Sequence, residues 1–145
     1  MSLLEVHGVT AGYGEVQILW GADLALEEGK LTALVGSNGA GKTTTLKLIL
    51  GLLKKQQGEV FIFEKLFEQN RIEILKNTGS LIENPSLYAH LTAKENLHLL
   101  QKVHQCPKNR IDEVLSLTGL SNTGKKKVSQ FSLGMKQRLS IAVSL

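Results

Sequence analysis

Eight residues, Gly36 to Thr43, restrict what this chain can fold into more than any other segment. They read Gly-Ser-Asn-Gly-Ala-Gly-Lys-Thr and fit G-x-x-x-x-G-K-[ST] at every fixed position. An apolar run, Leu31 to Val35, precedes them and predicts a buried strand. Apolar residues at helical spacing follow them. Strand, glycine-rich loop and helix in this order are typical of a phosphate-binding loop, whereas an ordinary glycine-rich turn needs neither flanking element.

The residue types in this loop suit a phosphate-bearing ligand together with Mg²⁺. Glycines let backbone N–H groups turn towards phosphate oxygens without a Cβ in the way. The N-terminus of the following helix adds partial positive charge beside the phosphates. Lys42 can reach β- and γ-phosphates, and the hydroxyl of Thr43 can ligate Mg²⁺.

The remaining pattern predicts an α/β fold. Residues 1–30 alternate between apolar and polar positions and carry glycines at the turns, which indicates short antiparallel strands. Thr92 and Glu95 have the spacing of a capping box, and Ser132 suits the N-cap of a last helix. The other expected elements are strands at 59–63 and 80–82 and helices at 71–77 and from Asn109 to Gly119.

Composition excludes several classes of protein. The 145 residues are 42% hydrophobic and 21% charged, which is typical of one folded domain and not of a disordered chain. No apolar run reaches the ~18 residues of a membrane span, and the N-terminus lacks the pattern of a secretory signal. The single cysteine, Cys106, forms no internal disulfide, which favours a reducing, intracellular compartment. The net charge of +4 is small and the lysines lack interleaved aromatic residues, so nucleic-acid binding is not expected.

On these motifs the chain resembles the ATPase subunits of ABC transporters, along essentially all of its length. Tyr13, within Ala-Gly-Tyr-Gly, lies where that family places an aromatic ring that stacks on adenine. Residues 131–138 are similar to the family's signature motif, in which Ser132 and Gly134 are retained and three positions depart from L-S-G-G-Q. The resemblance implies ATP and Mg²⁺ as cofactors. It implies that the loop residues that bind them are Asn38, Gly39, Ala40, Gly41, Lys42, Thr43 and Thr44.

Glu83 stands where the family has the glutamine of its Q-loop. A carboxylate oxygen can still reach Mg²⁺ or the attacking water, so Glu83 joins Thr43 as an expected metal ligand. The alternative is a surface carboxylate. Lys42 and Glu83 are then the supporting catalytic residues. The resemblance also implies transmembrane permease subunits as partners, and a second ATPase subunit whose nucleotide would face Ser132 and Gly134.

Two parts of the chain resemble different subfamilies. Residues 3–36 are similar to the ATPases of branched-chain amino acid importers, and residues 44–145 to those of bacitracin and lantibiotic self-protection exporters. We therefore consider a composite chain with a junction in or near the glycine-rich loop. An independently diverged natural sequence is the alternative.

A second acidic site that the family needs is not recognisable. The two aspartates, Asp23 and Asp112, lie before the loop and at a helix start, so neither suits the family's Walker B position. The chain thus resembles the N-terminal portion of an ATPase domain. Its expected parts are an antiparallel β part at 1–30, a Walker A core at 31–83 and a helical signature part at 84–145. ATP turnover by this chain alone is expected to be near background, and an unpaired apolar sheet edge is expected to favour self-association.

Two functions follow from these expectations. The first is the ATP-binding portion of a transporter ATPase, which in complete form couples ATP hydrolysis to transport and lies at the cytoplasmic face of the cell membrane. The alternative is a non-catalytic structural fragment or engineered chimera that self-associates.

Overall fold

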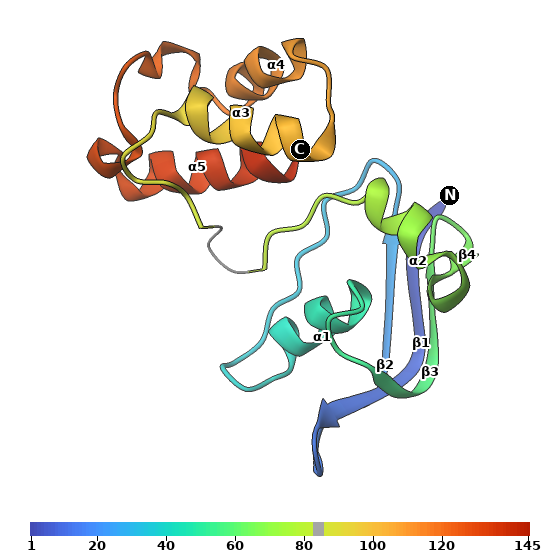
Figure 1. The fold of residues 1–145 in the computed structure, drawn as a ribbon. Helices are drawn as coiled ribbons and strands as arrows, with labels where there is room; N and C mark the ends of the chain where they lie inside the picture. The colour runs from blue at the N-terminus through green and yellow to red at the C-terminus, as the bar shows by residue number, and fades with distance from the viewer. Residues whose placement is uncertain (83–85) are drawn as a thin grey trace. The chain divides into compact units, whose positions relative to one another are not determined.

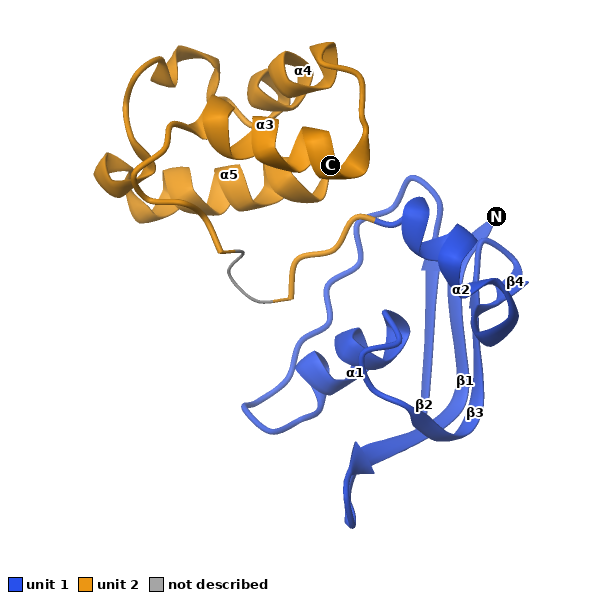
Figure 2. Cartoon of the chain, in the orientation of Figure 1, with its two compact units in different colours: residues 1–78 blue, residues 79–145 orange. Residues whose placement is uncertain are grey.

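The computed structural model describes residues 1–82 and 86–145. The chain forms two compact units, residues 1–78 and residues 79–145 (Figure 2). The first unit holds a sheet and two helices, and the second is helical (Figure 1). Among the described residues, no helix is long and apolar enough to span a membrane.

The sheet of the first unit is antiparallel throughout, with strand order β2-β1-β3-β4. Its strands are β1 (Ser2–Tyr13), β2 (Val16–Glu27), β3 (Lys55–Ile62) and β4 (Lys65–Leu66). The two long strands β1 and β2 form a hairpin, which confirms the antiparallel pairing predicted for residues 1–30. Strand β2 lies at one edge of this sheet, and β1 lies in its middle.

One face of the sheet carries the core of the first unit. Leu4 pairs with Ile62 and Val6 with Val60, and all four side chains are buried. Val9 is buried as well, although strict alternation after Val6 would turn it outward. The pairing shifts register between Val6 and Val9, around Gly8 at φ 55°, and this bulge returns the later residues of β1 to the core face.

Two helices pack into the same core. Helix α1 (Lys42–Ile49) contributes Leu48 and Ile49, and helix α2 (Phe67–Lys76) contributes Phe67 and Ile74. Gly51, at φ 67°, follows the end of α1. The predicted helix after the glycine-rich loop is therefore confirmed.

The second unit is built from α3 (Ala93–His104), α4 (Asn109–Leu117) and α5 (Leu133–Ser144), with two short 3₁₀ turns, η1 (Ser121–Thr123) and η2 (Val128–Gln130). The predicted capping box is present, because the side chain of Thr92 accepts from the N–H of Glu95 and the Glu95 carboxylate accepts from the N–H of Thr92. The bond that the Glu95 carboxylate accepts from the N–H of Thr92, together with a bond from the Thr92 side chain, holds the pKa of Glu95 below its ordinary value.

Two predicted strands are wrong. Residues 31–35 form no regular element, and Leu31 and Val35 are almost fully exposed. An apolar strand that is covered on both faces needs a neighbour on each side, and none of the described strands pairs with this segment. Residues 80–82 also lie outside any strand.

Candidate phosphate-binding loop

The glycine-rich loop turns directly into α1. Gly39 and Gly41 have φ values of 88° and 89°, a left-handed conformation that a side chain would strain. A Cβ placed on Gly36 would lie 3.0 Å from the Cβ of Ala40, so the inside of the loop is closed to side chains there. Gly41 is the N-cap of α1, and no side chain caps this helix end. The first N–H groups of α1 have no partner within the helix and can bind an anion.

Lys42 folds back over the loop. Its Nζ donates to the carbonyl oxygens of Gly36, at 2.7 Å, and of Ser37, at 2.8 Å. The N–H of Ala40 donates to the same Ser37 carbonyl at 3.1 Å, which closes a turn. The ammonium group of Lys42 is thus held at the loop, where its positive charge can attract a phosphate.

The three threonines that follow Lys42 have different surroundings. Thr44 and Thr45 are buried, and Thr45 anchors the helix start because both its N–H and its Oγ1 donate to the carbonyl oxygen of Gly41, at 2.8 and 2.9 Å. Thr43 is exposed. An exposed threonine at the start of the helix fits the hydroxyl ligand that Mg²⁺ would need there.

The charge around the loop also favours an anion. Residues 29–58 contain five lysines and no aspartate or glutamate. Lys30 and Lys55 pair with acidic residues outside this segment, Glu27 and Glu68. This segment therefore contributes no negative charge that would oppose anion binding at the start of α1 and at Lys42.

Strand β2 supports the loop, a contact that the sequence analysis missed. A Cβ placed on Gly41 would lie 2.9 Å from Cδ2 of Leu19 and 3.6 Å from Cγ2 of Ile18. The backbone of Gly41 therefore rests on these two side chains. The alternation in residues 1–30 could place Ile18 and Leu19 in a strand, but it contains no signal that links them to Gly41, more than twenty residues later.

The other predicted site residues lie elsewhere. Tyr13 is the last residue of β1, opposite Val16, and is half exposed. Ser132 and Gly134 belong to the second unit, where Oγ of Ser132 caps α5 by accepting from the N–H of Met135 at 3.2 Å. Glu83 lies outside the described residues. The roles of these four residues remain predictions.

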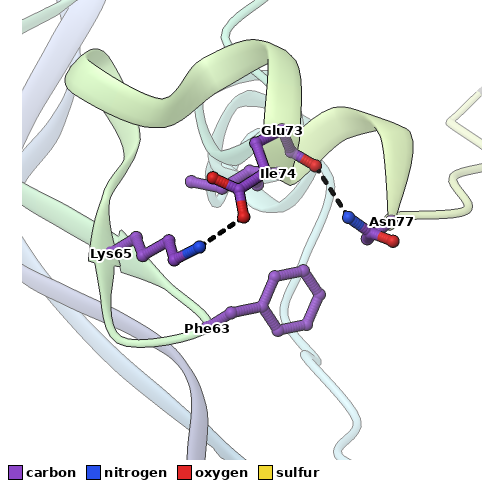
Figure 3. A pocket seen from close by; sticks show the side chains of 5 residues that line it. All are labelled: Phe63, Lys65, Glu73, Ile74 and Asn77. Carbon is purple, nitrogen blue, oxygen red and sulfur yellow. Dashed lines mark hydrogen bonds and ion pairs between the residues drawn. The ribbon is translucent and has the colours of Figure 1, made fainter.

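A pocket of about 300 Å³ lies elsewhere in the first unit, beside α2 (Figure 3). Its lining includes Phe63 and Ile74. Lys65 forms an ion pair with the carboxylate of Glu73, and Asn77 donates to the backbone oxygen of Glu73 at 2.9 Å. Its polar groups thus bond to one another, whereas the loop presents uncapped N–H groups, and the loop is the better candidate site.

Comparison with known proteins agrees with this choice. The family described as ABC transporter matches residues 19–145. The chain belongs to the ABC transporter family. Its strands, its loop and its helices form part of the ATP-binding domain fold of that family, and α5 carries most of the segment that resembles the signature motif.

Two relatives of this chain are named as transport ATP-binding proteins. The chain is 43% identical to the bacitracin transport ATP-binding protein BcrA of Bacillus licheniformis, over 99% of this chain and 47% of that protein. It is 41% identical to the lantibiotic transport ATP-binding protein SrtF of Streptococcus pyogenes, over 99% of this chain and 61% of that protein. The chain thus spans about half of the length of these relatives. The composite-chain hypothesis is not confirmed by these matches.

Solved structures share the fold. An ATP-binding subunit of an ABC transporter matches with a TM-score of 0.79 at 29% identity, over 98% of this chain and 61% of that one. CbiO1 of Clostridium perfringens, part of the ABC transporter complex cbiONQ, matches with a TM-score of 0.87 at 23% identity, over 99% of this chain and 61% of that one. The second likeness concerns the fold alone.

Proposed function

We propose that this chain binds MgATP at the loop of residues 36–44, as part of an ATPase that drives an ABC transporter. The uncapped start of α1 and the ammonium group of Lys42 carry the proposal, because together they offer backbone donors and a positive charge to a phosphate. The left-handed glycines Gly39 and Gly41 keep the loop free of side chains. Bound ATP and Mg²⁺ would supply the reacting phosphate and its charge neutralisation.

Each loop residue has a proposed part in this binding. The N–H groups from Asn38 to Thr44 hold the phosphates. Lys42 exchanges its bonds to the carbonyls of Gly36 and Ser37 for bonds to phosphate oxygens. The exposed hydroxyl of Thr43 ligates Mg²⁺, and Glu83 lies near the same metal. Tyr13 stacks on the adenine.

The relatives' names support a proposal about the partners. BcrA and SrtF are named as transport ATP-binding proteins for bacitracin and for a lantibiotic. We therefore propose that the complete protein works with transmembrane permease subunits that move an antibiotic peptide, at the cytoplasmic face of the membrane. A second ATPase subunit would place its nucleotide against Ser132 and Gly134. Self-association was expected through an unpaired sheet edge, but residues 31–35 form no strand, so we propose a homo-oligomer through this exposed apolar segment instead.

Calorimetry with MgATP tests the nucleotide site. Lys42→Ala removes the ammonium group at the loop, and Lys54→Ala removes the same charge from an exposed position in the same basic segment. We expect micromolar binding that falls at least about tenfold in the Lys42 variant, since charge-assisted bonds to phosphate are lost, and changes little in the Lys54 variant. No binding by the unmodified chain, or equal losses in the two variants, would show that the loop is not the site.

A further inference from the structure

Leu19 is the deeply buried side chain of the edge strand β2. It is 6% exposed, and the other residues of that strand are partly or fully exposed. It pairs with the buried Ala11 of β1 across the hairpin. Leu19 is therefore fixed by the sheet on one side, and its end points towards the loop.

The contact with Gly41 is close. Cδ2 of Leu19 lies 2.9 Å from where a Cβ of Gly41 would be, a spacing that leaves room for a glycine and for no other residue without movement. Gly41 is held from the helix side as well, because its carbonyl oxygen accepts two bonds from Thr45. Its conformation is thus determined between a buried leucine and the first turn of α1.

Gly41 needs such support. A glycine has the widest choice of φ and ψ, and no side-chain bond caps this helix end. The N–H groups that would meet a phosphate follow directly, beginning with Lys42. A small displacement of Gly41 would move these donors away from the positions that a phosphate requires.

We propose that Leu19 is a positioning residue for the phosphate-binding loop: its side chain seats Gly41 and thereby fixes the direction of the first N–H groups of α1. This inference rests on the proposed binding of MgATP. Leu19 touches the loop backbone and acts on the ligand only through it. Replacing Leu19 should therefore weaken the binding of the phosphates and leave the contacts with the adenine unchanged.

The experiment separates this role from ordinary core packing. Leu4 is equally buried, at 5%, in the same cluster, and has no contact with Gly41. Leu19→Ala and Leu4→Ala remove the same atoms from that cluster. Binding of MgATP and of magnesium tripolyphosphate, which has no adenine, is measured for both variants of the full chain by calorimetry, under conditions where circular dichroism shows them folded.

We expect Leu19→Ala to weaken both ligands by about the same factor, on the order of tenfold, and Leu4→Ala to change either by less than about twofold. Leu19→Met has a side chain of similar volume that can still contact Gly41, so it should bind both ligands about as tightly as the unmodified chain does. If an alanine variant does not fold, Leu19→Val and Leu4→Val make the same comparison with a smaller loss.

Equal effects of the Leu19 and Leu4 variants would overturn the inference, as would a loss confined to MgATP. Either result leaves the proposed nucleotide site intact, because the unmodified chain still binds. If the unmodified chain binds neither ligand, the proposed function fails, and the inference fails with it.

Discussion

Replacing Gly41 by alanine should destabilise the first unit more than the same replacement at Gly39. Both glycines have nearly the same φ, 89° and 88°, so both alanines are strained by about 1–2 kcal/mol. The space around them differs. The new methyl group at Gly39 meets nothing within 4 Å, whereas at Gly41 it lies 2.9 Å from Cδ2 of the buried Leu19. Relieving that contact inside a packed core costs a further ~1–3 kcal/mol. We expect a total loss of about 2–5 kcal/mol for Gly41→Ala and about 1–2 kcal/mol for Gly39→Ala.

Hydrogen exchange measured by mass spectrometry gives the free energy of opening for peptides of β1 and β3, and so reports on the first unit alone. The double variant Leu19→Ala/Gly41→Ala provides an internal check. Trimming Leu19 removes the atom that the new methyl group meets, so the two changes should be non-additive by about 1–3 kcal/mol. Equal losses for Gly39→Ala and Gly41→Ala, or strict additivity in the double variant, would refute the contact between Leu19 and Gly41.

Two predictions concern the second unit. Asn96→Ala should lower the free energy of unfolding of this unit by about 2–4 kcal/mol, because the buried amide accepts from the N–H of Tyr88 and donates to the carbonyls of Tyr88 and Thr92. The control, Asn122→Ala at an exposed position, should cost under about 0.5 kcal/mol. Urea titration followed by circular dichroism measures both variants, and similar midpoints would contradict the role of Asn96. The pKa of Glu95 is lowered by its bonds to Thr92, so the ionised Glu95 should stabilise the unit fully above the ordinary glutamate pKa and lose this effect as the pH falls through its own lowered pKa. Between about pH 6 and about pH 3, the melting temperature should therefore fall more steeply for the unmodified chain than for Glu95→Gln. Parallel curves for the two proteins would contradict this prediction.

Helix ends were predictable because their chemistry is local. The Thr92 capping box, the Ser132 cap and the left-handed Gly119 after α4 each depend on residues within one turn of the helix. The sequence pattern holds all the information that such an end requires. The loop of residues 36–43 was predictable for the same reason, since its turn, its helix start and its lysine are contiguous.

The strand pattern was only partly predictable. Alternation indicated antiparallel strands, and β1 and β2 confirm it. It could not indicate that both Val6 and Val9 face the core, because that depends on a bulge at Gly8 where the register of β1 shifts against both neighbours. Gly58 of β3 makes the close approach there: a Cβ on it would lie 2.4 Å from the carbonyl oxygen of His7. Contacts between distant segments of this kind are invisible to a local pattern.

Residues 31–35 show most clearly what an apolar pattern does and does not contain. Five consecutive apolar or small residues indicate that burial on both faces would stabilise this segment, by ~1.5–3 kcal/mol for each large side chain. They do not supply the neighbouring strands that would provide it. The segment runs directly into Gly36 and Ser37, whose carbonyl oxygens accept from Lys42. In this structure the order of the loop therefore comes from its C-terminal side, through Lys42 and through Gly41 seated on Leu19, and not from the apolar run that leads into it.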